Sequence, residues 1–186
     1  MLRMKSARAQ LAGLGLLVVL LAVQVGMLAS RSRASVPRSQ YVPLELGARL
    51  SSVRFESPVG PLTADDAAID ERYTVLLAFK STCRYCERAV PAWRQLDLVS
   101  DSLQRAGVRV RKISSESLPV ANRWLADHAL LAQNSVRIAD AVPGSIGHSL
   151  TGRTPWYFVF DSAGTLIAQG YGGEALAAVA RLPAVD

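Results

Sequence analysis

The sequence predicts an α/β domain whose central mixed β-sheet is flanked by helices, preceded by an N-terminal transmembrane helix. Three observations lead to this prediction. An apolar run without a charged residue fills residues 11–29. Strand-like apolar segments alternate with amphipathic helical segments from residue 73 to about residue 132. Two further strand-like segments, separated by a short turn, precede a last helix near the C-terminus.

The first 35 residues account for most of the net positive charge of the chain. The net charge of +6 divides into five basic and no acidic residues there, and 16 basic against 15 acidic residues in the remainder. A basic start before a long uncharged run predicts a retained membrane anchor, because about 20 apolar residues cross a bilayer as one helix. A cleaved export signal is the alternative. The nearly neutral remainder does not support nucleic-acid binding.

We expect the chain to have four parts. These are a cytoplasmic tail over residues 1–10, the anchor or signal peptide over 11–29, a linker over 30–43 and a folded domain over 44–186. The linker is polar and contains Pro37 and Pro43, a composition typical of a tether. With the N-terminus in the cytosol, the domain would face outward.

The first half of the domain follows from local patterns. Residues 44–66 hold short alternating pieces broken by glycine and proline, which predicts a β-hairpin. Residues 73–79 are apolar nearly throughout, as in a strand covered on both faces. A helix follows and ends near Gly107, with Ser81 or Thr82 as its cap and a kink at Pro91. Its core-facing stripe is Ala89, Trp93, Leu96, Val99 and Leu103.

The second half continues the alternation. Residues 108–113 predict a strand, and a helix capped by Ser117 follows over about 118–132. Residues 136–138 predict a short strand, and a loop or short helix leads to Arg153. Residues 156–160 and 165–169 predict a hairpin across the turn Asp161-Ser162-Ala163-Gly164. A helix over about 173–182 closes the domain.

Cys83 and Cys86 are the only cysteines of the chain, and they lie at the predicted junction of strand and helix. This spacing brings both sulfurs within bonding distance, and the positive end of a helix stabilises a thiolate on the first. We therefore predict a redox-active pair in which Cys83 is the attacking nucleophile, helped by the charge of Arg84, and Cys86 is the resolving thiol.

Two other interpretations of the cysteines remain open. The pair could be an inert structural disulfide or two buried thiols. A zinc site would need His128 and His148 as further ligands, but their wide spacing matches no zinc-finger pattern, and we expect no metal. His128 falls on an apolar helical stripe and is predicted to be a packed side chain. His148 precedes Pro155 and is a candidate for proton transfer.

Several features in this order resemble the thioredoxin superfamily, in particular the membrane-anchored thiol–disulfide oxidoreductases of the TlpA/ResA type. The resemblance covers about residues 44–182. An apolar strand leads into the motif Cys83-Arg84-Tyr85-Cys86, and Pro91 follows five residues after its second cysteine. Thr154-Pro155 precedes the strand–Asp-x-x-Gly–strand hairpin, and Gly170-Tyr171-Gly172 precedes the last helix.

The resemblance implies a thioredoxin-like fold with a cis peptide bond at Pro155. Thr154 and Pro155 would then bind an extended segment of a partner. Arg84 and Tyr85 would tune the redox potential and partner choice, or are simply solvated residues. The chain departs from the family at Thr82, where tryptophan is common, at Leu77, where cytosolic thioredoxins keep a proton-transferring aspartate, and in having no proline between the cysteines.

Together these points predict a membrane-anchored, extracytoplasmic thiol–disulfide oxidoreductase of a bacterial inner membrane, with its domain on the periplasmic side. It would reduce disulfides of exported proteins, for example in cytochrome c maturation. The sequence has no flavin or nicotinamide motif, so we expect no cofactor and infer a membrane thiol as electron donor. The alternative is a docking or assembly factor for one exported client, with dispensable thiols. A peroxiredoxin is disfavoured because Lys80 stands where its Thr-x-x-Cys motif needs threonine.

Overall fold

The computed structural model describes residues 20, 21, 23, 24, 41–50, 53–58, 60–62 and 71–183. Contacts divide the chain into a first unit, residues 1–40, and a second unit, residues 41–186. In the first unit the four described residues are helical. None of the described helices is both long and apolar enough to cross a membrane. The predicted tail, most of the predicted anchor and residues 30–40 of the predicted linker lie outside the described residues, whereas residues 41–43 belong to the second unit.

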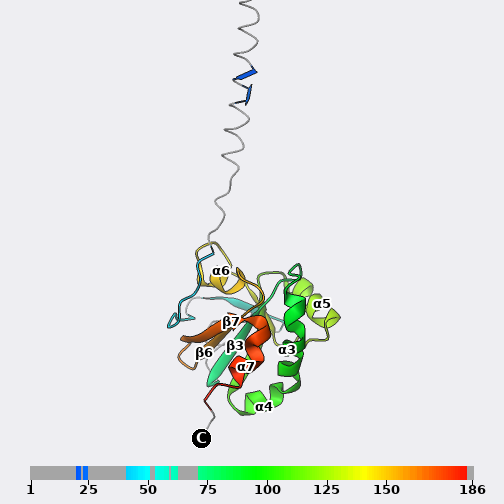
Figure 1. Ribbon diagram of the computed structural model, residues 1–186, viewed down its shortest axis with the longest axis vertical. Coiled ribbons are helices and arrows are strands. Elements are labelled where there is room, and N and C mark those ends of the chain that lie inside the picture. The colour runs from blue at the N-terminus through cyan, green and yellow to red at the C-terminus, as the bar shows by residue number, and fades with distance from the viewer. Residues whose placement is uncertain are drawn as a thin grey trace, which may run out of the picture. The chain divides into compact units, whose positions relative to one another are not determined.

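The second unit is built on a mixed sheet, drawn in Figure 1. Seven strands of the described ranges join in the order β2-β1-β5-β4-β3-β6-β7. β3 pairs in parallel with β4 and antiparallel with β6, so it is an interior strand of the sheet, and it leads to the cysteines. The strands are β1 (Phe55–Ser57), β2 (Gly60–Leu62), β3 (Tyr73–Ala78), β4 (Val108–Ser114), β5 (Ser135–Ile138), β6 (Trp156–Asp161) and β7 (Leu166–Tyr171).

The helices follow the predicted order. They are α3 (Cys86–Leu98), α4 (Ser100–Arg105), α5 (Leu118–Asp127), α6 (Ile146–Thr151), the 3-10 turn η1 (Gly172–Glu174) and α7 (Ala175–Val179). The sequence predicts one helix where the structure has two, α3 and α4. The break falls at Val99, because this side chain is 41% exposed and the apolar stripe leaves the core there. The break turns α4 so that Leu103 still packs on the core.

Helix α5 is shorter than predicted, and its cap is also different. The helix ends at Asp127 because Ala129 adopts a left-handed backbone with φ of 53°, which an α-helix cannot continue. Ser117 occupies the position before the helix, but its side chain makes no capping hydrogen bond. The predicted N-terminal hairpin is present as β1 and β2, although it is shorter than residues 44–66, and Arg49 forms only an isolated bridge with Thr165.

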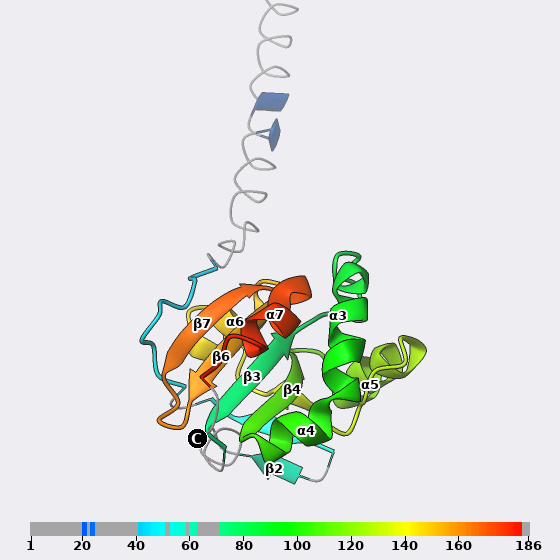
Figure 2. The same cartoon turned by 60° about the horizontal axis from the view of Figure 1, so that its bottom comes forward.

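Two hydrophobic clusters cover the two faces of the sheet. Because side chains alternate along a strand, Leu77 and Phe79 point to one face, and Leu76 and Ala78 to the other. The first face is covered by α3, α5 and α7, and α7 lies between α3 and β7 (Figure 2). The second face is covered by α6 and by residues 44–50 and 53–55. Trp93 of α3 is fully buried in the first cluster, where its indole N–H donates to the carbonyl of Gly172 at 2.9 Å.

Candidate active site

The cysteines lie where β3 ends and α3 begins. The backbone N–H of Cys83 donates to the carbonyl of Lys80 at 3.0 Å, and that of Cys86 donates to the carbonyl of Cys83 at 2.9 Å. These bonds close two successive turns, so α3 begins at Cys86 with Tyr85 at its cap position. The predicted cap by Ser81 or Thr82 is therefore wrong, since no side chain caps this helix.

Ser81 instead contacts a carboxylate that the sequence analysis did not single out. Its backbone N–H and its hydroxyl donate to the two oxygens of Glu116, at 2.7 and 2.6 Å. Glu116 follows β4, the parallel neighbour of β3, and the carboxyl ends of parallel strands meet at one edge of the sheet. This rule, applied to the acidic residue that follows the predicted strand over residues 108–113, could have identified Glu116 from the sequence.

Cys83 is the more accessible thiol, as predicted. It is partly exposed, and both thiols are free. Burial by itself raises the pKa of Cys83, but hydrogen bonds with the side chains of Cys86 and Thr154 and with the backbone of Cys86 and Tyr85 outweigh it. The pKa of Cys83 is therefore lowered from its ordinary value, which favours the thiolate, the nucleophilic form.

Cys86 has the opposite environment. Its side chain is fully buried in the first hydrophobic cluster, next to Ala89 and Trp93. Burial raises the pKa of Cys86 to about 12, and the hydrogen bond with Cys83 acts in the same direction. The two thiols therefore differ in reactivity although they lie three residues apart.

The segment Thr154-Pro155 lies against Cys83. The Thr154–Pro155 peptide bond is cis, which confirms that prediction, and the thiol of Cys83 donates to the carbonyl of Thr154 at 3.5 Å. Gly172 packs behind this segment. A Cβ added to Gly172 would lie 3.0 Å from both the Cβ of Pro155 and the Cζ2 of Trp93, so only glycine fits without displacement. A role for Thr154 and Pro155 in binding a partner stays a prediction.

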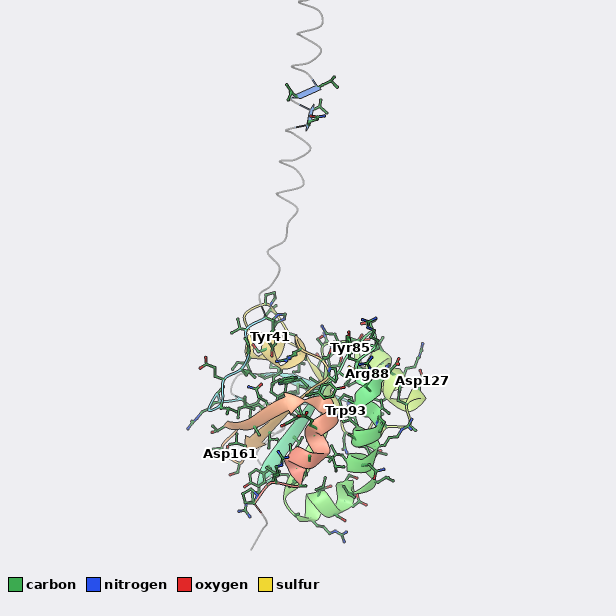
Figure 3. All side chains as sticks on the ribbon, in the orientation of Figure 1. Tyr41, Tyr85, Arg88, Trp93, Asp127 and Asp161 are labelled. Carbon is green, nitrogen blue, oxygen red and sulfur yellow. The ribbon has the colours of Figure 1, made fainter. Side chains whose placement is uncertain are left out.

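The two residues between the cysteines are exposed and contact each other. The guanidinium of Arg84 lies 5.0 Å from the centre of the Tyr85 ring and donates to the Tyr85 hydroxyl at 3.0 Å. The prediction that Arg84 helps to lower the pKa of Cys83 is therefore not supported, since hydrogen bonds from other groups account for the shift. Figure 3 shows Tyr85 and Arg88 at the start of α3, with Trp93 further along the helix.

The imidazole of His128 packs against Trp124, near the end of α5. The imidazole stacks on Trp124 with ring centres 4.2 Å apart, and its Nδ1 lies 2.8 Å from the Trp124 carbonyl oxygen. This confirms the prediction of a packed histidine. His148 lies in α6, where its backbone N–H donates to the hydroxyl of Ser145 at 3.0 Å. Proton transfer by His148 stays a prediction.

The domain has a carboxylate whose side chain is only 9% exposed, but it belongs to Asp97 of α3 and not to β3. Leu77 occupies the β3 position, and its partner in β4 is Lys112, whose side chain is fully buried. The ammonium of Lys112 donates to Asp97 of α3 at 2.5 Å and to the carbonyl of Leu131 at 3.2 Å. Asp97 is eleven residues along α3 from Cys86, about 16 Å at 1.5 Å per residue, which is too far for direct proton transfer.

No family model and no curated protein matches the sequence. Among solved structures, the chain resembles a thiol:disulfide interchange protein from Bacteroides sp., with 14% identity and a TM-score of 0.60 over 75% of this chain and 90% of that one. A secreted disulfide oxidoreductase of Mycobacterium tuberculosis has 17% identity and a TM-score of 0.51, over 72% of this chain and 98% of that one.

A third neighbour is the peroxidoxin BcpB of Mycobacterium tuberculosis. It has 12% identity and a TM-score of 0.55, over 75% of this chain and 99% of that one. At such identities the likeness concerns the fold alone, and it includes proteins named for two kinds of thiol chemistry. The central mixed sheet, the covering helices and these neighbours establish that the described residues of the second unit have a thioredoxin-like fold.

Proposed function

We propose that this protein is a thiol–disulfide oxidoreductase that uses Cys83 and Cys86 as its redox pair. The observation that carries the proposal is the contrast between the two thiols. Cys83 is partly exposed with a lowered pKa, while Cys86 is buried with a pKa of about 12. A structural pair of cysteines has no need for this asymmetry, whereas a nucleophile and a resolving thiol need it.

The proposed reaction moves two electrons to a partner disulfide. The thiolate of Cys83 attacks one sulfur of that disulfide, a mixed disulfide forms, and the other partner sulfur leaves as a thiolate and takes up a proton. Cys86 then loses its proton and attacks the sulfur of Cys83. The mixed disulfide breaks, the second partner thiol leaves, and the Cys83–Cys86 disulfide remains. A membrane dithiol donor restores the reduced pair by the reverse exchange.

The finer parts of the proposal rest on the resemblance to the membrane-anchored family and on the apolar run over residues 11–29. We place the domain on the periplasmic side of a bacterial inner membrane, with exported proteins as its clients and their reduction, as in cytochrome c maturation, as its task. An outer compartment also suits a chain whose only cysteines form the redox pair.

The first test is the reduction potential of the full chain, equilibrated in thiol redox buffers. A single two-electron transition near about −270 mV is expected for a reductant, whereas about −120 mV would make the protein an oxidant. The absence of a reversible transition would refute the redox proposal. Extraction of membranes with alkaline carbonate tests the anchor, since a retained span stays with the lipid and a cleaved chain is released.

The rival proposal, a docking factor with dispensable thiols, predicts a different result for one variant. Cys83→Ser would leave a docking function intact in cells that lack the wild-type chain. An oxidoreductase would lose its function in that variant. Cys86→Ser would accumulate the mixed disulfide with its client, which non-reducing electrophoresis detects as a band that disappears on reduction.

A further inference from the structure

Four basic residues belong to the two segments that meet at Cys83, and we call them the basic rim: Lys80, Arg84, Arg88 and Arg153. Lys80 and Arg84 flank Cys83 in the chain, and the Lys80 carbonyl accepts the hydrogen bond from the Cys83 N–H. Arg88 lies in the first turn of α3, four residues after Arg84. Arg153 precedes Thr154, whose carbonyl accepts from the Cys83 thiol. The rim therefore comes from the two segments that meet at the reactive sulfur.

Aromatic rings, rather than carboxylates, hold the three arginines in place. The guanidinium carbons of Arg84 and Arg88 lie 5.0 and 5.3 Å from the centre of the Tyr85 ring, and Tyr85 is 45% exposed. The guanidinium carbon of Arg153 lies 3.4 Å from the centre of the Trp156 ring. A stacked guanidinium keeps its position yet retains most of its N–H donors for a further carboxylate.

The four basic residues of the rim form no ion pair within the described ranges. The ion pairs found within the described ranges join other basic residues, namely Arg54, Arg109, Lys112 and Arg137, to carboxylates. Two acidic residues, Glu87 and Glu116, lie in or next to these segments, and the carboxylate of Glu116 accepts only the neutral donors of Ser81. Four basic against two acidic residues leave an excess of positive charge here, whereas residues 36–186 as a whole hold 16 basic and 15 acidic residues.

We propose that the basic rim selects partner proteins that carry acidic side chains next to their reactive cysteine. This inference rests on the proposed redox function and names its substrate class. Partner carboxylates would pair with Arg88 and Arg153, which come from the two segments that meet at Cys83, and would align the partner's sulfur with the thiolate. Opposite charges on two surfaces speed their encounter by about 10 to 1000 times, and this effect decreases with salt.

The test uses the reduced full chain and three symmetrical peptide disulfides. Each is a dimer of Gly-Xaa-Cys-Xaa-Gly in which Xaa is Glu, Ser or Lys, and each rate is divided by the rate at which dithiothreitol reduces the same peptide. At low salt we expect the Glu peptide to react about tenfold faster than the Ser peptide and the Lys peptide more slowly than either. At about 0.5 M NaCl the three normalised rates should converge.

The variant R88E/R153E should invert the preference, so that the Lys peptide becomes the fastest. Arg84 is left unchanged because it lies between the cysteines. The matched control is R105E, which makes the same kind of charge change on α4, beyond the far end of α3, and should keep the preference of the wild-type chain. Thermal melting of each variant identifies any loss of folding.

The outcomes separate this inference from the proposed function. If the Ser peptide is reduced but the three normalised rates agree at low salt, the basic rim does not select acidic partners and the redox function stands. A preference for Glu that R88E/R153E leaves unchanged also overturns the role of the rim. If none of the peptides is reduced, the proposed function itself fails, and the inference fails with it.

Discussion

The two ends of helix α3 have different environments. At the C-terminal end, Asp97 accepts from the buried ammonium of Lys112 and from the N–H of Leu131, so helix, strand and loop are joined by charged hydrogen bonds. At the N-terminal end no side chain caps the helix, and Cys83 remains partly exposed. One end therefore stabilises the fold, while the other is left open for chemistry.

A single helix can both stabilise the fold and present a reactive thiol, because buried contacts hold its middle. The middle of α3 is fixed by Trp93, which is fully buried and donates to Gly172. This contact also places the segment of Pro155 beside the cysteines, because the backbone N–H of Gly172 donates to the Pro155 carbonyl at 3.3 Å. The reactive end thus takes its geometry from buried contacts further along the same helix.

The largest expected effect is at the reactive end. Cys83→Ser should abolish reduction of peptide disulfides, because serine cannot form the mixed disulfide, while the melting temperature should change little. The measurement is the rate of reduction of the Ser peptide under excess dithiothreitol, with the uncatalysed rate subtracted. Turnover that persists in this variant would contradict the role of Cys83.

The second prediction separates the two thiols by pH. Alkylation of the reduced chain with iodoacetamide should modify Cys83 at a pH below the ordinary thiol range, because its lowered pKa favours the thiolate. Cys86, with a pKa of about 12, should react more than about a thousandfold more slowly near neutral pH, since each pKa unit is a factor of ten. Peptide mapping measures both rates, and in urea they should become equal.

The third prediction concerns the buried end. Lys112→Met should destabilise the fold by about 3–5 kcal/mol, because it leaves Asp97 as a buried charge without its partner. Denaturant unfolding measures the loss, and alkylation of Cys83 in the remaining folded protein should be unchanged. The double variant K112M/D97L should recover part of the stability. Equal stability of K112M and the wild type would show that the pair is not needed.

The smallest expected effect lies next to the reactive end, at the contact of Glu116 with Ser81. Glu116→Gln should lower the free energy of unfolding by about 1–3 kcal/mol, because an amide has only one oxygen for the two donors of Ser81. The neighbouring control Ser117→Ala should change it by less than about 0.5 kcal/mol, since that side chain makes no capping bond. A loss at Ser117 equal to that at Glu116 would show that the whole loop, not the carboxylate, matters.

The sequence predicts most of the elements because each depends on local pattern. The strand over residues 73–79, the strand over 108–113 and the C-terminal hairpin agree with β3, β4, β6 and β7 within one or two residues. The break at Val99 and the early end of α5 could not be predicted in this way. Both depend on which side chains reach the core and on the left-handed backbone of Ala129, which a helical pattern does not show.

By itself, the sequence determines the spacing of Cys83 and Cys86, the alternation of strands and helices, and the position of the residue pair Thr154-Pro155. These are properties of neighbouring residues. Only the tertiary structure brings Thr154 to Cys83, Glu116 to Ser81, and Asp97 to Lys112. Such contacts join residues that are distant along the chain, and they exist only after the sheet is paired and α3 is packed against it. The thiol pKa values and the arginine-rich surroundings of Cys83 depend on that packing.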